Sequence, residues 1–166
     1  MTSLASVVYK DLGDYTQILP SWLGHSGVLA YLDEVGGSDR VANGPISKAT
    51  KSKQGFILLG FYEPSGESVT VADLLAIAIE PDRQRQGLGR CLLRYAIELA
   101  TMIGARNKIN EIRLTVADSN TPGRRLFTSA GFQVLDANHG VYDGGQRAIR
   151  MTRTLAPSMT YWRHTF

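Results

Sequence analysis

Two apolar runs in the middle of the chain predict the centre of a β-sheet. The first run spans residues 55–62 and ends at a turn-forming segment, Glu63-Pro64-Ser65-Gly66, and the second spans residues 69–79. Two such runs on either side of a turn predict an antiparallel hairpin. The second run is apolar at odd and even positions alike, which is typical of a strand covered by helices on both faces of its sheet. We therefore expect an α/β fold.

An amphipathic helix is predicted directly after this hairpin, over residues 88–103. Its apolar stripe consists of Leu88, Leu92, Tyr95, Ala96, Leu99 and Ile103. Gly104 is expected to end the helix, because glycine is the common residue just past a helix C-terminus. Residues 111–116 alternate between polar and apolar and predict the next strand.

A shorter helix is predicted after that strand, ending at Gly131. Its candidate N-caps are Asp118, Ser119 and Asn120, and Pro122 would lie in its first turn. Residues 132–136 and 147–155 predict two last strands. The whole pattern predicts a mixed sheet of six or seven strands with helices on both faces.

The first fifty or so residues have weaker patterns. Residues 6–12 predict a short first strand, and residues 14–35 have apolar residues at helical spacing. Pro20 and Gly24 interrupt that spacing, so two short helices are expected there. Residues 36–54 are polar and contain glycines, which predicts a long loop.

Length and composition indicate one globular domain. The chain has 166 residues, and we expect a domain over residues 1–155 and a C-terminal tail over residues 156–166, which is a candidate arm onto a second copy in a homodimer. The net charge of +3 comes from scattered residues apart from a cluster at residues 83–90, which argues against a nucleic-acid partner. The single cysteine, Cys91, excludes an intramolecular disulfide and favours a reducing compartment.

A membrane partner and a metal site are not expected from the sequence. No apolar stretch approaches the roughly 20 residues that span a bilayer, and residues 1–10 lack the pattern of a signal peptide. No metal-ligand motif is evident. A cytoplasmic location is therefore expected.

The segment from Leu74 to Leu93 carries the clearest chemistry. A buried strand ends at Pro81, a polar turn follows, and Gly87 and Gly89 begin a helix. Backbone N–H groups at a helix N-terminus favour anions, and glycines let a phosphate approach closely. Arg83, Arg85 and Arg90 add positive charge around the turn. A dinucleotide fingerprint would need a third glycine where Leu92 stands, and the Gly-Lys-Ser/Thr of a nucleoside-triphosphate loop is absent.

Two groups of residues resemble one known family. Gln84-Arg85-Gln86-Gly87-Leu88-Gly89 is similar to the Q/R-x-x-G-x-G/A signature of the GNAT superfamily of CoA-dependent N-acetyltransferases. Leu114–Asn120, Leu126-Phe127 and Gly131-Phe132 resemble the second conserved region of that family in order and spacing. The resemblance covers about residues 55–155. It implies a mostly antiparallel mixed sheet with a splay between two central parallel strands, here those at 71–79 and 111–117.

The resemblance also implies acetyl-CoA as co-substrate. The pyrophosphate would lie on backbone amides of the signature, the pantetheine arm would pair with the end of the second apolar run like an added strand, and Asn120 would reach the pantetheine. The implied cofactor-binding residues are Ile77, Ala78, Ile79, Gln84, Arg85, Gln86, Gly87, Leu88, Gly89, Arg90, Asn120 and Phe127.

The implied reaction is direct attack of a neutral primary amine on the thioester carbonyl in a ternary complex, with the backbone at Ile79 as a candidate to polarise that carbonyl. Many family members have a tyrosine that protonates the departing thiolate where this chain has Phe127, which has no hydroxyl. Tyr142 or a water is a candidate substitute acid, or the thiol leaves unaided.

Candidate bases are Asp73, Glu80 and His139, the last in the predicted loop between the final strands. Asp73 lies inside an apolar run, where burial would make it a better base. It would otherwise be a carboxylate satisfied by hydrogen bonds, and Glu80 a solvated charge at a strand end. The acceptor would be a small-molecule amine, or a protein N-terminus or lysine. The alternative function is a weak or inactive acyl-CoA sensor on the same fold.

Overall fold

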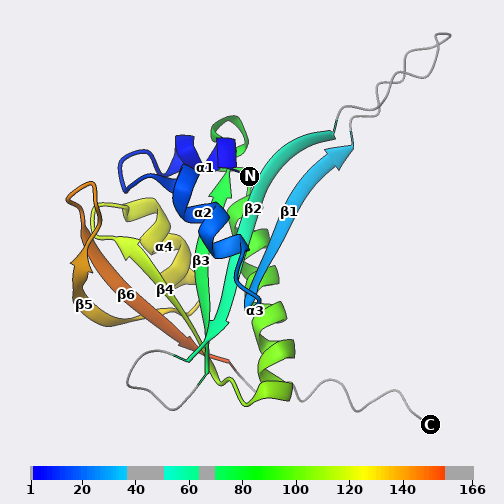
Figure 1. Cartoon of the computed structure of the whole chain (residues 1–166), viewed down its shortest axis with the longest axis vertical. Coiled ribbons are helices and arrows are strands. Elements are labelled where there is room, and N and C mark those ends of the chain that lie inside the picture. Colours follow the sequence, from blue (N-terminus) through cyan, green and yellow to red (C-terminus); the bar gives the residue numbers. More distant parts are fainter. Residues whose placement is uncertain (1, 37–50, 64–69, 156–166) are drawn as a thin grey trace, which may run out of the picture.

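A six-stranded mixed sheet forms the centre of the computed structural model, which describes residues 2–36, 51–63 and 70–155 (Figure 1). Its strands are β1 (Val28–Gly36), β2 (Lys51–Tyr62), β3 (Val71–Ile79), β4 (Glu111–Ala117), β5 (Gln133–Val141) and β6 (Arg147–Thr154). They lie in the order β1-β2-β3-β4-β6-β5, and every neighbouring pair is antiparallel except the parallel pair of β3 and β4. The predicted mixed, mostly antiparallel sheet is confirmed.

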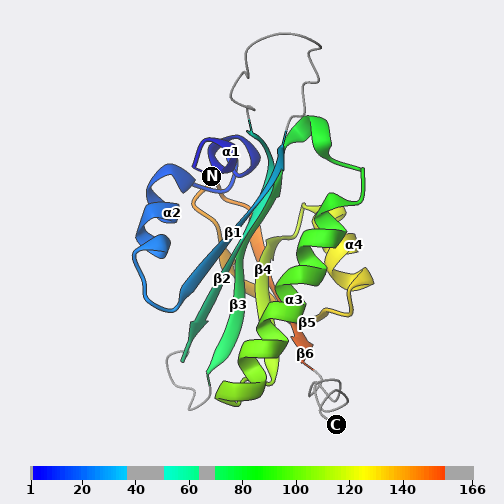
Figure 2. The same cartoon turned by 90° about the vertical axis from the view of Figure 1, so that its right-hand side faces the viewer.

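Helices cover both faces of this sheet, as the apolar pattern of β3 predicts. Figure 2 shows α1 (Thr2–Val8) and α2 (Tyr15–Leu23) on one side and α3 (Leu88–Asn107) and α4 (Thr121–Ser129) on the other. Ala76 and Ala78 of β3 pack into the core under α1 and α2, whereas Leu74 and Ile79 pack into the larger core under α3 and α4. In the described part of the chain, no helix is both long and apolar enough to cross a membrane.

The two parallel strands separate partway along their length. The ladder between β3 and β4 pairs Ala72 with Ile112, Asp73 with Arg113 and Leu74 with Leu114, although both strands continue beyond these residues. The register between β2 and β3 shifts at the level where the ladder with β4 ends. Leu58 pairs with Ala76 and Leu59 pairs with Leu74, so Leu75 is an extra residue on β3. Such a bulge bends and twists its strand. The predicted splay therefore starts at Leu75, and the strands diverge toward the top of Figure 1.

The N-terminal predictions were partly wrong. Residues 6–12, predicted to be a strand, contain the end of α1 and a turn. The first of the two helices expected in residues 14–35 is present as α2, with Asp14 as its N-cap and Pro20 inside it. The second is replaced by β1, which pairs along its length with β2. Pairing with a distant strand outweighed a weak local periodicity, because a ladder satisfies every second backbone group of an edge strand.

Three element boundaries also differ from the predictions. Residues 37–50 of the predicted loop lie outside the described residues, but 51–54 belong to β2. The helix α3 continues past Gly104 to Asn107 and ends where Lys108 adopts a left-handed conformation. The strand β5 extends beyond the predicted end at Asp136 to Val141. The predicted C-terminal tail, residues 156–166, lies outside the described residues.

Gly104→Ala is expected to destabilise the fold, although alanine forms helices better than glycine. An added Cβ would overlap with the carbonyl oxygen of Ile109, a backbone atom that cannot turn away. We expect the free energy of unfolding, measured in urea, to fall by about 1–3 kcal/mol. Ala105→Gly at an exposed position of the same helix is the control and should cost about 1 kcal/mol. A Gly104→Ala protein as stable as the wild type would contradict this packing.

Candidate active site

The splay leaves backbone groups of β3 directed away from its other neighbour. The N–H of Glu80 donates to the carbonyl of Gln54 on β2 at 2.8 Å, so Glu80 faces β2. Because the N–H and C=O groups of successive strand residues point to opposite sides, Ile77 and Ile79 direct theirs toward the splay. The end of β3 therefore presents the donors and acceptors of two residues to whatever lies between β3 and β4.

Two side chains of the protein already contact these groups. The hydroxyl of Tyr9 donates to the carbonyl oxygen of Ile77 at 2.5 Å and accepts from the N–H of Ile77 at 2.9 Å. The side-chain amide of Gln84 donates to the carbonyl oxygen of Ile79 at 3.1 Å. Ala78, between the two isoleucines, is buried against α1 and α2. Of the three residues implied to hold a pantetheine arm, Ile77 and Ile79 thus direct backbone groups into the splay, whereas Ala78 pairs with Phe56 of β2. Gln84 ties the following turn to the strand end.

The turn after β3 brings backbone N–H groups to the N-terminus of α3. Pro81–Arg83 form a short 3-10 helix, and Gly87 is the N-cap of α3 with φ of 86°. A Cβ at Gly87 would meet no atom within 4 Å, so the left-handed backbone, and not crowding, requires glycine there. Arg85 also has a positive φ of 60°. Successive amides in such a turn form a concave donor site that suits an anion.

Three basic residues belong to this turn and to the first turn of α3. Arg83, Arg85 and Arg90 are all exposed, and Arg83 also forms an ion pair with Asp82 at 3.8 Å. Gln86 donates from its side chain to the carbonyl of Asp82 at 3.2 Å. Leu88 and Gly89 are half-buried in the first turn of α3. The predicted phosphate-binding residues are therefore contiguous in space as they are in sequence.

The two cofactor candidates of the second region have structural roles in the free chain. Asn120 caps α4 by accepting from the N–H of Gly123 at 2.9 Å. Phe127 is buried in the larger core, edge-to-face with Phe132 at a centroid distance of 6.0 Å. A Cβ at Gly123 would lie 2.7 Å from the side-chain nitrogen of Asn120, so glycine permits this close cap.

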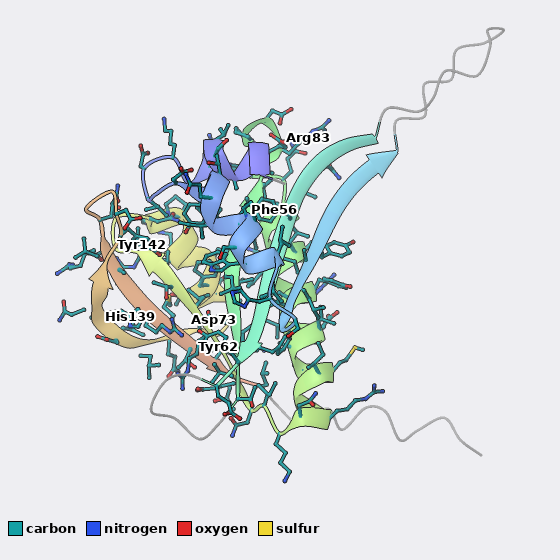
Figure 3. The ribbon with its side chains drawn as sticks, in the orientation of Figure 1. Phe56, Tyr62, Asp73, Arg83, His139 and Tyr142 are labelled. Atoms are coloured by element: carbon teal, nitrogen blue, oxygen red, sulfur yellow. The ribbon has the colours of Figure 1, made fainter. Side chains whose placement is uncertain are left out.

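A cavity of about 660 Å³ lies beneath α2 at the start of the splay. It is bounded by α2, the beginning of β1, the end of β2, the middle of β3, β4 and the segment before β6. Its lining residues are Tyr15, Ile18, Trp22, His25, Ser26, Gly27, Val28, Gly60, Phe61, Tyr62, Asp73, Leu74, Leu75, Thr115, Tyr142 and Arg150. Two of the predicted catalytic residues, Asp73 and Tyr142, are thus brought together from segments far apart in the chain (Figure 3).

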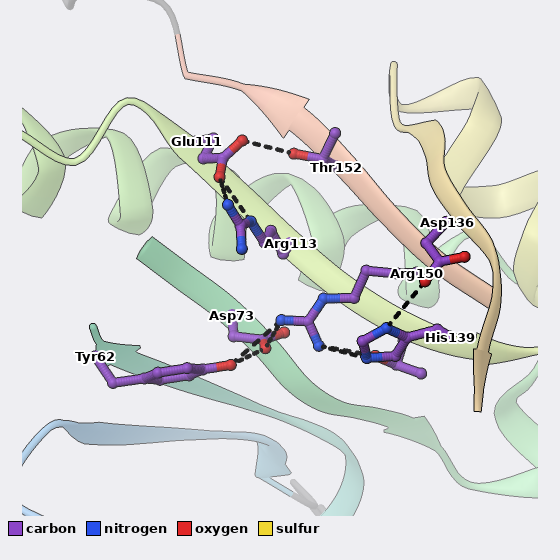
Figure 4. Close-up of polar contacts among 9 residues, drawn as sticks. Tyr62, Asp73, Glu111, Arg113, Asp136, His139, Arg150 and Thr152 are labelled. Carbon is purple, nitrogen blue, oxygen red and sulfur yellow. Dashed lines mark hydrogen bonds and ion pairs between the residues drawn. The ribbon is translucent and has the colours of Figure 1, made fainter. Parts of the chain in front are cut away.

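Asp73 forms a buried ion pair with Arg150 of β6 (Figure 4). The two side chains are 6% and 14% exposed, and their closest N–O distance is 2.9 Å. The hydroxyl of Tyr62 donates to the same carboxylate oxygen. The guanidinium also donates to Thr115 at 3.1 Å and lies 3.4 Å from His139. Asp73 is therefore a carboxylate satisfied by hydrogen bonds, the plainer of its two expected roles, and it also lines the cavity.

Tyr142 contributes a neutral hydroxyl to the cavity. Burial raises the pKa of Tyr142 well above its usual range, Tyr15 and Asp73 raise it further, and Arg150 opposes them. The same effect of burial raises the pKa of Tyr9, with which Tyr15 and Tyr142 interact. Three phenol groups from separate segments therefore stay protonated side by side at neutral pH, each able to donate a hydrogen bond.

Neither Glu80 nor His139 lines the cavity, although His139 contacts Arg150 at its edge. Glu80 follows the last residue of β3, seven residues from Asp73, or about 23 Å at the usual rise of a strand. His139 lies within β5, not in a loop as predicted, and its ring is 3.6 Å from the carboxylate of Asp136 and in contact with Arg150. Across residues 2–36, 51–63 and 70–155, no group of three or more His, Cys, Asp and Glu is arranged to hold a metal ion.

Comparisons with known proteins agree with this fold. The six-stranded sheet with its opened parallel pair belongs to the class of α/β acetyltransferase folds. The solved ribosomal-protein-S18-alanine N-acetyltransferase of Escherichia coli matches with a TM-score of 0.58 at 24% identity, covering 91% of this chain and 82% of that one. Arabidopsis thaliana NAA60 in complex with acetyl-CoA matches with a TM-score of 0.65 at 12% identity, covering 93% of each chain. At these identities the likeness is one of fold.

Sequence comparison gives the family. The model of the acetyltransferase (GNAT) domain matches residues 42–134, more than half of the chain. The ribosomal protein bS18-alanine N-acetyltransferase of Escherichia coli strain K12 is 37% identical over 83 residues, which are 48% of this chain and 53% of that protein. The chain thus spans about half the length of the curated relatives it matches. It belongs to the acetyltransferase (GNAT) domain family.

Sequence reasoning missed Tyr9, Tyr62 and Arg150. Tyr9 lies just after α1, in a segment predicted to be a strand, so no pattern connects it with β3. Arg150 stands in the predicted last strand, three residues after its start. The available signal for Arg150 was its charge inside a short strand, between Ile149 and Met151, which are buried. A charge in such a place needs a partner.

Breaking the buried pair of Asp73 and Arg150 should destabilise the protein strongly. Arg150→Met leaves the carboxylate without its cation, and we expect the free energy of unfolding to fall by about 3–5 kcal/mol. Adding Asp73→Leu to Arg150→Met should recover part of that loss, because no unpaired charge remains. The matched control is Arg94→Met, whose ion pair with Glu98 has side chains 74% and 64% exposed and should be worth under about 1 kcal/mol. Equal losses at Arg150 and Arg94 in urea titrations would contradict the burial of the pair.

Proposed function

We propose that this protein transfers the acetyl group of acetyl-CoA to a primary amine by direct attack in a ternary complex. The observation that carries the proposal is the interrupted ladder of β3 and β4. It leaves the backbone of Ile77 and Ile79 directed into the splay, between the turn that begins α3 and the cavity under α2. A thioester carrier with a diphosphate at one end fits this arrangement, in which the turn, the free edge of β3 and the cavity follow one another along the strand. The solved complex of NAA60 with acetyl-CoA supports the choice of carrier.

The carrier is proposed to run back along β3 from the anion site. The pyrophosphate would accept hydrogen bonds from the amides of Gln86 to Arg90, with Gln84 and Arg85 completing the turn. The pantetheine arm would then pair with Ile79, and the acetyl group beyond it would reach Ile77, because the anion site follows the strand end. This direction assigns the thioester carbonyl to the N–H of Ile77, one strand repeat deeper than the Ile79 of the sequence-based hypothesis.

The chemistry is proposed to need little from side chains. A neutral amine in the cavity would attack the carbonyl carbon, so that an N–C bond forms and the C–S bond breaks, while one proton passes from the nitrogen through the Tyr142 hydroxyl to the departing sulfur. The N–H of Ile77 would stabilise negative charge on the carbonyl oxygen. Tyr142 would give a proton to the departing thiolate, since Phe127 has no hydroxyl. Asp73 would be a positioning residue that holds the side chain of Arg150 in place. Glu80 would lie outside the cavity.

The cavity supports an acceptor whose amine is attached to an uncharged, apolar or aromatic body. A polyamine would need several free carboxylates, but Asp73 already pairs with Arg150 and Tyr62. A free amino acid would need a cation for its carboxylate, but Arg150 already contacts Asp73, Thr115 and His139. The rest of the lining is mainly aromatic and aliphatic. A peptide N-terminus fits the same requirement, and the name of the Escherichia coli relative supports that source.

An amine panel tests this function and its acceptor class. With acetyl-CoA and thiol release as the assay, 2-phenylethylamine and a peptide amide with N-terminal Ala-Phe should be acetylated at least about tenfold more efficiently than spermidine or free alanine. Trp22→Ala should lower kcat/KM for 2-phenylethylamine about tenfold, because it removes an aromatic wall of the cavity. Tyr95→Ala, an exposed aromatic of α3, is the control. Turnover of spermidine alone would refute the acceptor class.

The same panel separates the enzyme from a sensor. The buried, hydroxyl-free Phe127 favours the sensor as the second candidate. Saturable acetyl-CoA binding without thiol release on any amine would establish the sensor and exclude the transferase.

Bulky residues at Gly87 and Gly89 should abolish acetyl-CoA binding. Gly87→Val forces a β-branched side chain into a left-handed backbone, which costs at least about 1–2 kcal/mol there or distorts the turn. With Gly89→Val added, calorimetry should show acetyl-CoA affinity at least about a hundredfold weaker. Thermal unfolding of the variant shows whether the fold persists. Full affinity in the folded double variant would refute the anion site.

A further inference from the structure

Tyr9 contacts the backbone of β3 in the splay, and the proposed reaction gives this residue no role. Its hydroxyl bonds with both the N–H and the C=O of Ile77. Both groups face the splay, where the ladder with β4 has ended. Buried backbone groups without partners cost free energy, so something must satisfy them when no ligand is bound.

A hydroxyl is one of the few side-chain groups that satisfies both needs at once, because it donates one hydrogen bond and accepts others. The ring of Tyr9 is held by stacking on Tyr15 of α2, with centroids 4.4 Å apart and an angle of 22° between the rings. Tyr15 in turn meets Trp22 edge-to-face at 6.0 Å. Burial raises the pKa of Tyr9, so the hydroxyl keeps the proton that it donates to Ile77. The contact is therefore built by the fold of α1 and α2 onto β3.

We propose that the Tyr9 hydroxyl holds the place of the acetyl carbonyl in the free protein and must leave Ile77 when acetyl-CoA binds. The inference rests on the proposed function, which assigns the N–H of Ile77 to the thioester carbonyl. One N–H donates well to one acceptor, so the carbonyl oxygen and the Tyr9 oxygen compete for it. CoA without an acetyl group has no carbonyl at this point and leaves the Tyr9 contact intact.

Tyr9 is then a positioning residue that sets the relative affinity for substrate and product. In the free protein it keeps the edge of β3 satisfied, which holds the splay open for a ligand. During the cycle the Tyr9 hydroxyl leaves Ile77 only while the acetyl group is bound. It returns to Ile77 after the acetyl group has been transferred. The residue acts through Ile77 and takes no part in bond formation.

Calorimetry of acetyl-CoA and CoA binding to Tyr9→Phe tests the proposal. The variant keeps the ring and its stacking but loses the hydroxyl. We expect the Kd for acetyl-CoA to fall about fivefold, as one net hydrogen bond of about 1 kcal/mol no longer has to be broken. The Kd for CoA should stay within about twofold. Tyr95→Phe, at an exposed position on α3, is the matched control and should change neither value.

Several outcomes would overturn the inference. An unchanged or higher Kd for acetyl-CoA, or an equal change for both ligands, would show that Tyr9 does not compete with the acetyl group. If the wild-type protein bound neither ligand, the proposed function itself would fail, and this inference with it. Should Tyr9→Phe not fold, nuclear magnetic resonance of the wild type supplies the second test. Acetyl-CoA should shift the Tyr9 ring signals, and CoA should leave them in place.

Discussion

The parallel ladder between β3 and β4 stops after Leu74 and Leu114, and the site depends on this interruption. A continuous ladder would pair the backbone of Ile77 and Ile79 with β4 and leave no space between the strands. The bulge at Leu75 gives the interruption a local cause, because an extra residue on β3 bends the strand where the pairing ends. The unpaired edge then requires partners, and the free chain supplies them from Tyr9 and Gln84.

The two faces of the sheet divide the chemistry of the site. The turn proposed to bind the diphosphate is a continuous piece of chain, from the end of β3 to the first turn of α3. The cavity under α2 is assembled from segments distant in sequence, including Trp22, Asp73 and Arg150. In the proposed function this turn and the cavity adjoin the same opened strand pair, so that a carrier and an acceptor would be held at the same time, as direct transfer requires.

The predictable parts of the molecule are those that local chemistry specifies. The hairpin of β2 and β3, the helix α3 and the cap at Asn120 followed from apolar spacing, turn residues and a side chain that satisfies helix N–H groups. Residues 6–12 and the segment that forms β1 were predicted wrongly. Their periodicity is short, and contacts with β2 and β3 determine their structure. Asp73 was rightly singled out as an unusual charge, but its partner Arg150 lies 77 residues away and could not be paired with it.

The amino-acid order was sufficient to specify the family and the turn proposed to bind a diphosphate, because the glycines, the helix start and the arginines lie within one short stretch of backbone. Folding in three dimensions was needed for the cavity under α2, the Asp73–Arg150 pair and the contact of Tyr9 with Ile77. These features depend on side chains from separate elements meeting at fixed distances, and no local pattern records which elements will meet. Sequence therefore specified the turn where a diphosphate is proposed to bind, and packing specified the cavity proposed for the acceptor.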